Sequence, residues 1–471
     1  MPIERADGIT ESERYLKRLC DQTFLSLWSY PGVYSDEGLV KSKQGEEVCD
    51  LLAVFENHII IFSDKDCQFP NSGNLAVDWK RWFKKSIQKS AQQLWGAEGW
   101  IKKYPERLFL DKLCTQRFPL YIPDIKTAKF HLIAVAHSSS ARCRQEFGGT
   151  GSLKIKTSIK GNNHYVKEGG GSPFYIGDID PKRTFVHILD DISLDSVLSN
   201  LDTVSDFVAY LTKKEEFFRA KYHISAASEL EILAHYHKFI NDDGERDFFL
   251  PGHLSGQGAE LVLEEGSWKE FEQSSGRKAK LEEDKISYQW DALIERINHY
   301  TFREELYFTS HLSIAEQEIL LRFIARENRF HRRIFSKILC DLIYSAPLDG
   351  TRTVRYVPHP SYAGFCYVFL VHPPLYYSTY DQYRNERRDA LYKRCRVAKL
   401  RFPDAQDIVG VATETVVLSQ EGRSTDVIHV DVTTWTSEDD IQVKQIEQEL
   451  KLSQDLQTFC ARYDEYPIEE I

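Results

Sequence analysis

The sequence predicts an α/β protein with three parts: an α/β unit over residues 1–200, a helical region over 201–350 and a C-terminal α+β unit over 351–471. Three observations support this division. In the first part, two β-branched runs joined by a very short connection indicate a hairpin. Apolar residues at helical spacing dominate the second part. In the third part, segments with strand patterns alternate with segments with helix patterns.

The first part contains a clear order of elements. An amphipathic pattern predicts a helix over 11–30, and the hairpin strands follow over 48–55 and 59–65. A second helix is predicted over 77–95 and a further strand over 129–137. Because the hairpin runs are apolar at nearly every position, we expect a central strand pair that is buried on both faces.

The third part is predicted from shorter patterns. We expect strands over 352–357, 364–371, 408–418 and 426–433, and helices over 380–397 and 437–462.

The composition excludes several classes of protein. The 471 residues are 42% hydrophobic and 13% aromatic, so long disordered regions are not expected. No apolar run approaches the ~18 residues of a membrane helix, and the N-terminus has no apolar signal segment, so a cytoplasmic protein with no membrane partner is expected. The nine cysteines are odd in number and show no C-x-x-C spacing, which predicts reduced thiols rather than disulfides or structural zinc.

The net charge sets a limit on nucleic-acid binding. With 60 basic and 71 acidic residues the chain carries −11, whereas proteins that coat nucleic acid by bulk charge are usually basic. Any nucleic-acid binding must therefore use local basic patches, and an enzyme with one basic groove remains compatible with the composition.

Charged side chains occur at the open end of the predicted hairpin. Asp50 precedes the apolar part of the first strand, and Ser63, Asp64 and Lys65 end the second. Ionised groups beside an apolar sheet are costly unless they are paired or bind a metal. Two registers are open: one places Asp50, Ser63 and Lys65 on a single face, and the other pairs Asp50 with Asp64. In both registers, carboxylates and a lysine converge.

This combination suits metal-assisted hydrolysis of a phosphodiester. Carboxylate oxygens are the ligands that Mg²⁺, or Mn²⁺ in its place, prefers. Asp50, with Asp64 or Glu47, would hold the metal, which polarises the phosphoryl oxygen and acidifies a water molecule. Lys65 would orient that water or stabilise the charge that develops on the phosphate. The candidate catalytic group is therefore Glu47, Asp50, Ser63, Asp64 and Lys65.

At these residues the sequence resembles the PD-(D/E)XK nuclease superfamily, which has the restriction-endonuclease-like fold. The resemblance covers roughly the first 190 residues. It implies a core of helix, motif-bearing hairpin, helix and strand, corresponding here to 11–28, 48–65, 77–95 and 129–137. It places the first acid of the family on Asp50 and the final lysine on Lys65. Many members belong to prokaryotic restriction or anti-phage systems, and many pair two active sites, which implies a homodimer or a partner protein as an expectation.

One position departs from the family pattern. The second acid of the motif falls on Ser63, and the adjacent Asp64 would point to the opposite face unless a bulge intervenes. Glu46 or Glu47 could supply the missing carboxylate. Many members carry an acid on the first helix, and Glu13 is the corresponding candidate metal ligand here.

Two basic segments are candidates for nucleic-acid contacts. The helix after the hairpin carries five basic residues and no acid between 80 and 89, which is typical of a surface that follows a phosphate backbone. Its candidate contact residues are Lys84, Lys85, Gln88, Lys89 and Gln92. A later basic helix follows several tyrosines, and Arg387 and Arg388 are its candidates. Solvated helix faces paired with acids are the alternative interpretation for both segments.

Two functions follow from these observations. The first is a Mg²⁺-dependent nuclease that acts on DNA, with RNA as an alternative substrate. The second is a catalytically degenerate nuclease fold that serves as a binding or assembly module for nucleic acid or a partner protein, with Ser63 marking the lost acid.

Overall fold

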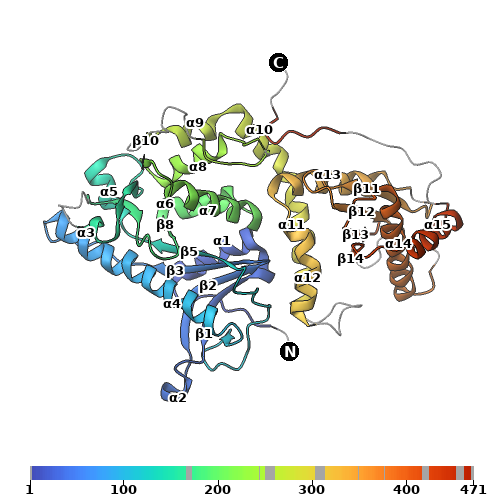
Figure 1. Ribbon diagram of the computed structural model, residues 1–471, viewed down its shortest axis with the longest axis horizontal. Helices are drawn as coiled ribbons and strands as arrows, with labels where there is room; N and C mark the ends of the chain where they lie inside the picture. The colour runs from blue at the N-terminus through green and yellow to red at the C-terminus, as the bar shows by residue number, and fades with distance from the viewer. Residues whose placement is uncertain are drawn as a thin grey trace. The chain divides into compact units, whose positions relative to one another are not determined.

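The structure is a computed structural model, and it describes residues 3–165, 172–242, 244–249, 260–302, 313–347, 349–375, 377–415, 424–451 and 461–467. The protein is a mixed α/β protein, as the sequence predicts (Figure 1). Contacts along the chain define two compact units, with unit 1 running to Ala279 and unit 2 beginning at Lys280. Along the described residues, no helix combines the length and the apolar character needed to cross a bilayer.

A six-stranded mixed sheet forms the centre of unit 1. Its strand order is β4-β1-β2-β3-β5-β8. The strands are β1 (Ser29–Ser35), β2 (Glu46–Phe55), β3 (His58–Lys65), β4 (Leu108–Phe109), β5 (Lys129–Ala136) and β8 (Val186–Asp190). Strand β2 is antiparallel to both β1 and β3, whereas β5 and β8 run parallel to β3. The predicted hairpin and the predicted strand over 129–137 are therefore confirmed.

Helices cover both faces of this sheet. They are α1 (Glu11–Trp28), α3 (Leu75–Phe83), the π-helical turn η1 (Lys84–Gln88), α4 (Lys89–Lys103), α6 (Asp191–Asn200) and α7 (Val204–Phe218). Figure 1 shows α3 and α4 running along the sheet on one side, with α6 and α7 on the other. The ring of Phe62 on β3 packs against Phe24 of α1 and Phe207 of α7, so these helices share one face. The predicted helix over 77–95 extends in the structure to Lys103.

The hairpin register decides which side chains share a face. In β2 and β3, Leu51 pairs with Phe62 and Leu52 pairs with Ile61. Continuing this register places Asp50 opposite Ser63, so the predicted register with Asp50, Ser63 and Lys65 on one face is confirmed. The alternative that pairs Asp50 with Asp64 is wrong. Residues Leu51–Phe55 of β2 and Ile59–Phe62 of β3 are buried, as their apolar sequences predict.

A second sheet completes unit 1, in the order β10-β9-β6-β7. Its strands are β6 (Lys154–Lys160), β7 (Tyr175–Asp178), β9 (His223–Ala226) and β10 (Glu260–Leu263). The helices that follow or connect these strands are α5 (Ser140–Phe147), η2 (Gly161–His164), α8 (Glu229–His237), α9 (Ser267–Gln273) and α10 (Ser275–Asp284), and α10 continues into unit 2. The short helix α2 (Leu39–Ser42) lies between β1 and β2 of the first sheet. Residues 201–350, predicted as helical, thus also contribute two strands. Strands of four residues are too short to show an alternating pattern in the sequence.

Unit 2 is a four-stranded sheet between helices. The strand order is β11-β12-β13-β14, with β12 and β13 parallel and the outer pairs antiparallel. The strands are β11 (Thr353–Pro358), β12 (Phe365–Val371), β13 (Asp407–Thr413) and β14 (Thr425–Asp431). The helices are η5 (Lys285–Ser287), α11 (Tyr288–Phe302), α12 (Ile314–Ala325), α13 (Arg329–Ser345), α14 (Tyr380–Arg401) and α15 (Ser437–Glu449). All four predicted strands are present, although residues 416–418 of the predicted third strand and 452–460 of the last predicted helix lie outside the described residues.

Helix α14 is the crossover between the parallel strands and packs closely on the sheet. Leu391 and Cys395 of α14 join Val368, Ile408 and Ala412 in a buried apolar cluster. A Cβ at Gly410 of β13 would lie 2.6 Å from the sulfur of Cys395, so only glycine permits this approach.

Candidate functional site

The open end of the β2–β3 hairpin brings three of the predicted site residues together. The Asp50 carboxylate accepts a hydrogen bond of 2.5 Å from the backbone N–H of Asp64. The ammonium nitrogen of Lys65 lies 3.8 Å from the same carboxylate oxygen. Continuing the hairpin register beyond Leu51 and Phe62 puts Ser63 opposite Asp50, and strand alternation places Ser63 and Lys65 on that face.

A β-bulge adds Glu47 to this group. In the β1–β2 pair, Val33 pairs with Cys49, but the next residue, Tyr34, pairs with Glu47, so Val48 is an extra residue in β2. Paired residues share a face of the sheet, so Glu47 lies on the face opposite to Cys49, which is the face of Asp50. Plain alternation would have placed Glu47 on the other side. We call Glu47, Asp50, Ser63 and Lys65 the hairpin corner.

The hairpin corner carries an excess of negative charge. Partial desolvation, followed by the charges of Asp50 and Glu13, raises the pKa of Glu47 to about 7. Burial also raises the pKa of Asp50, although Lys65 and the Asp64 N–H oppose this shift. Neighbouring carboxylates whose pKa values are raised in this way favour a bound divalent cation, which would offset their negative charge.

Glu13 belongs to the surroundings of the hairpin corner through its charge. Its negative charge contributes to raising the pKa values of both Glu47 and Asp50. One carboxylate oxygen of Glu13 accepts the backbone N–H groups of Ile9 and Thr10, as part of the capping box of α1. The helix cap therefore already occupies part of the hydrogen-bonding capacity of Glu13.

Asp64 points away from the hairpin corner. Its side chain is fully buried on the α1 face of the sheet, where Oδ1 lies 2.6 Å from Nε2 of His137. The other ring nitrogen of His137 lies 2.5 Å from Asp191. Desolvation alone would lower the pKa of His137, but the hydrogen bonds to Asp191 and Asp64 raise it to about 10. The carboxylate predicted beside Asp50 is thus absent from that face, because β3 has no bulge in its pairing with β2 or β5.

The hairpin corner opens into a pocket of about 650 Å³. Glu46, Glu47, Asp50 and Ser63 line it from the sheet, and Gln93, Trp100 and Lys103 of α4 line it from the opposite side. Only the tertiary structure joins these two walls, because α4 follows β3 by more than twenty residues. Pockets of this size hold small molecules in many proteins.

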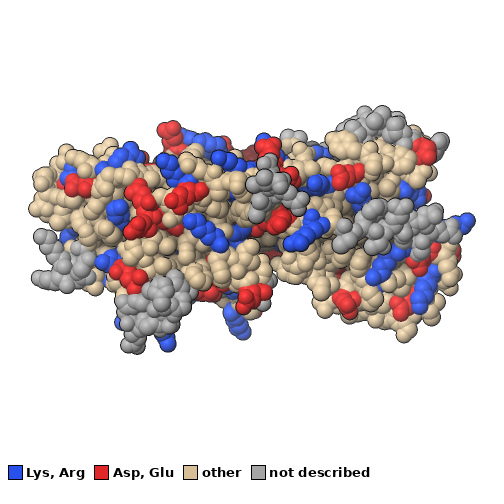
Figure 2. All heavy atoms as spheres, turned by 90° about the horizontal axis from the view of Figure 1, so that it is seen from above, with Lys and Arg blue, Asp and Glu red and all other residues tan. Residues whose placement is uncertain are grey.

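The basic side chains after the hairpin lie at the surface. Lys84, Lys85, Lys89 and Gln92 are exposed and Gln88 is half-buried. The ammonium of Lys84 lies 5.1 Å from the ring centroid of Tyr165. Their predicted contact with nucleic acid stays a prediction. On the face drawn in Figure 2, basic and acidic side chains are interspersed, and neither sign forms a continuous field.

Arg387 requires a correction. It is fully buried, and its guanidinium binds Asp426 and Glu414 in unit 2. A buried, ion-paired arginine presents no atoms to a phosphate backbone, so its predicted contact with nucleic acid is wrong. The basic pattern of this helix arises from internal ion pairs. Arg388 is half-buried on the same helix, and its predicted contact stays a prediction.

A second group of ligand-type residues lies in unit 2. Atoms of Glu327, His331 and His359, all buried, lie within 4.8 Å of one another and could hold a metal ion. The Glu327 carboxylate is 3.1 Å from Nδ1 of His331 and 2.9 Å from Nε2 of His359, and it accepts a hydrogen bond from Tyr367. Burial opposes the shift, but the hydrogen bonds from the two histidines lower the pKa of Glu327 to about 2.

The hydrogen bonds of His359 oppose metal binding at this place. Its Nδ1 accepts the backbone N–H groups of Ser361 and Tyr362. An Nδ1 that accepts puts the proton of a neutral imidazole on Nε2, the atom that faces Glu327, and a protonated nitrogen cannot bind a metal. The cluster is therefore satisfied by its own hydrogen bonds. Sequence reasoning missed it; the spacing of Glu327 and His331, four residues apart on the chain, was the available signal.

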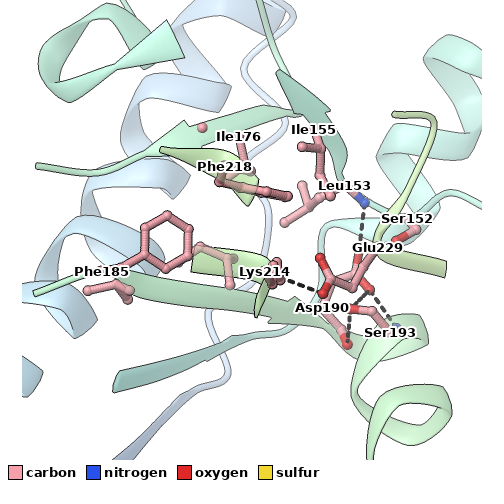
Figure 3. Close-up of a pocket in the computed structure, with 13 residues that line it drawn as sticks. Ser152, Leu153, Ile155, Ile176, Phe185, Asp190, Ser193, Lys214, Phe218 and Glu229 are labelled. Atoms are coloured by element: carbon pink, nitrogen blue, oxygen red, sulfur yellow. Dashed lines mark hydrogen bonds and ion pairs between the residues drawn. The ribbon is translucent and has the colours of Figure 1, made fainter. Parts of the chain in front are cut away.

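A small cavity in unit 1 is lined by polar side chains that are paired with one another (Figure 3). It has a volume of about 20 Å³, enough for about one water molecule. The ammonium of Lys214 lies 2.5 Å from Glu229, which also accepts a hydrogen bond from Tyr210. Asp190 accepts hydrogen bonds from Ser152 and from the start of α6. These groups join the two sheets of unit 1 and leave no room for a substrate.

No known protein-family profile matches the chain, and neither does any curated protein or any solved structure.

Proposed function

We propose that unit 1 is a metal-dependent nuclease that hydrolyses phosphodiester bonds, with DNA as the first substrate to test. The observation that carries this proposal is the hairpin corner, where Glu47 and Asp50 line a pocket and Lys65 lies 3.8 Å from Asp50. Two carboxylates without a full set of cationic partners suit a divalent metal such as Mg²⁺ or Mn²⁺.

The fold of unit 1 is compatible with the resemblance to PD-(D/E)XK nucleases. The resemblance implies a helix, a motif-bearing hairpin, a helix and a strand, and α1, β2–β3, α3–α4 and β5 follow in this order. Ser63 stands where the family motif has its second acid. The bulge at Val48 puts Glu47 on the face of Asp50, so Glu47 can supply the missing carboxylate. We assign the role of the second metal ligand to Glu47 rather than to Asp64.

The three charged residues of the hairpin corner then divide the work between metal binding and activation of water. Asp50 and Glu47 would hold the metal, which polarises the phosphoryl oxygen and makes a water molecule more acidic. Lys65 would orient that water or stabilise the developing negative charge. Lys84, Lys85 and Lys89 would contact the nucleic-acid strand on either side, and a partner subunit would be needed to cut both strands of a duplex at one place.

The test is cleavage of plasmid DNA, linear duplex, single-stranded DNA and RNA with Mg²⁺, Mn²⁺ or EDTA. Wild type is compared with Asp50→Asn, Lys65→Ala and, as a matched control, Lys41→Ala, which removes an exposed lysine from α2. We expect metal-dependent cleavage that both site variants lose and the control retains. Cleavage that survives in Lys65→Ala would place the chemistry elsewhere.

One observation favours the second candidate, a nuclease fold that binds without cutting. The acid of the motif is Ser63, and His137 holds its neighbour Asp64 on the opposite face. Nucleic-acid binding without cleavage in any metal would support this function. In that case we expect Ser63→Glu, which restores an acid opposite Asp50, to gain metal-dependent cleavage.

A further inference from the structure

The pocket beside the hairpin corner has two chemically different sides. The sheet contributes acids, including Glu46, Glu47 and Asp50. The end of α4 and the turn after it contribute rings and cations, which we call the aromatic–basic wall: Trp100, Lys103, Tyr104 and Arg107. The proposed hydrolysis gives these four residues no task.

The aromatic–basic wall is held in a compact arrangement. The ring centroids of Trp100 and Tyr104 lie 4.8 Å apart. The guanidinium carbon of Arg107 lies 5.1 Å from the first centroid and 4.6 Å from the second. Asp36 accepts hydrogen bonds of 2.9 Å and 3.1 Å from Nε of Arg107. The ammonium of Lys103 lies 4.9 Å from the Tyr104 centroid, so two cations and two rings form one surface.

Two glycines of α4 leave the space in front of this wall open. Gly96 and Gly99 line the pocket, and a Cβ built on either would meet no atom within 4 Å. Packing therefore does not require glycine at these positions. Each glycine inside a helix costs about 1 kcal/mol relative to alanine. The volume that they leave empty belongs to the pocket.

We propose that the aromatic–basic wall is a subsite for one unstacked nucleotide, next to the phosphodiester at the hairpin corner. Ring faces and the guanidinium of Arg107 stack on any nucleobase, and the cations pair with a neighbouring phosphate. A pocket of about 650 Å³ accepts a nucleotide but not a base-paired duplex. The inference rests on the proposed function and specifies its substrate as a single strand or a locally opened duplex.

Charge supports this placement of the substrate. The acidic side of the pocket repels a polyanion until a cation is bound there. Lys103 and Arg107 are the cations that line the pocket on the opposite side, and Arg107 forms an ion pair with Asp36. A strand that enters with one nucleotide on the aromatic–basic wall would therefore meet the ammonium of Lys103 before a metal binds at the hairpin corner.

The test measures binding without cleavage, in EDTA, by fluorescence anisotropy of labelled oligonucleotides. The probes are an oligothymidylate strand, its RNA equivalent, a duplex of equal length and an abasic strand. Trp100→Ala removes the larger ring, and Gly99→Leu fills the pocket from the helix. Trp95→Ala is the matched control, because Trp95 lies on α4 outside the pocket lining and donates its indole N–H to Thr184.

We expect wild type to bind the DNA or RNA strand more tightly than the duplex and the abasic strand. Trp100→Ala and Gly99→Leu should weaken single-strand binding about tenfold, as expected for loss of one base-stacking contact, while Trp95→Ala binds as wild type does. Thermal melting shows whether each variant folds. If Trp100→Ala does not fold, the binding of Gly99→Leu decides whether the subsite exists, because leucine is a better helix former than glycine.

The inference is overturned if folded Trp100→Ala and Gly99→Leu bind the strand as wild type does, or if the abasic strand binds equally well. Failure of the proposed function is a different result. Binding that depends on Trp100 without cleavage in any metal would retain the subsite and reject the nuclease.

Discussion

Unit 1 and unit 2 both place carboxylates beside cations, but they balance the charges in opposite ways. In unit 2, Arg387 is fully buried between Glu414 and Asp426, and Arg332 is fully buried beside Asp291. In unit 1, Lys65 lies 3.8 Å from Asp50, and burial together with the charge of Asp50 raises the pKa of Glu47 to about 7. A balanced, enclosed group stabilises one conformation, whereas an unbalanced group beside a pocket is suited to binding a ligand.

The largest expected effect tests the two faces of the β2–β3 hairpin in unit 1. Glu47→Gln should lower metal-dependent cleavage by about a hundredfold or more, because it removes a proposed metal ligand. Asp64→Asn should retain cleavage within a few fold, since its side chain points to the opposite face. Cleavage rates at saturating Mg²⁺ measure both. Equal losses in the two variants would contradict the assignment of Glu47.

The next effect concerns the buried ion pairs of unit 2. Arg387→Ala should lower the free energy of unfolding by about 3–5 kcal/mol, because it leaves two buried carboxylates without their partner. Urea denaturation measures this loss. At a temperature where the variant is folded, affinity for nucleic acid should equal that of wild type. A loss of affinity for nucleic acid with unchanged stability would instead support the contact between Arg387 and nucleic acid that the sequence predicts.

The Glu327 cluster should behave as a hydrogen-bonded group without a metal. Glu327→Gln should lower the free energy of unfolding by about 2–3 kcal/mol at pH 7. The folded-state pKa of about 2 lies below the unfolded value, so this contribution is complete above about pH 4.5 and is lost as the pH falls toward 2. Chelators and added Zn²⁺ should leave the melting temperature unchanged. A melting temperature lowered by chelation would show a bound metal.

The His137 group in unit 1 should show the opposite pH dependence. Its folded-state pKa is raised to about 10 from 6.5, so the stability it provides is complete below about pH 6.5 and is lost as the pH rises through 10. His137→Gln should therefore lower stability by about 2 kcal/mol near pH 6 and by less near pH 10. Urea titrations at both values measure the difference. A constant difference would mean that His137 is neutral in the folded protein.

The smallest effect concerns the exposed lysines of η1 and α4. Replacing Lys84, Lys85 and Lys89 together by alanine should reduce the salt dependence of DNA binding by roughly one unit of slope for each lost phosphate contact, with little change in stability. Affinity measured at several salt concentrations gives this slope. An unchanged slope would identify these lysines as a solvated helix face.

The elements of the fold were predictable where their patterns are long. The helix at Glu11–Trp28, the β2–β3 hairpin and the strands of unit 2 follow from apolar periodicity. The four-residue strands β9 and β10 were not predictable, because four residues contain only two alternations of apolar and polar side chains, and such a short pattern also arises by chance. The basic runs in α13 and α14 were also ambiguous, since a sequence does not show whether an arginine meets solvent or a buried acid.

The sequence by itself determined the position of Asp50 and Lys65 at one end of a buried hairpin, because a short connection and strand alternation leave few arrangements. Tertiary structure alone decided the rest of the candidate site. The bulge at Val48 depends on pairing with β1, and the wall around Trp100 depends on how α4 packs across the sheet. Neighbours within one strand constrain each other through backbone geometry, whereas residues on separate elements meet only when the whole core packs.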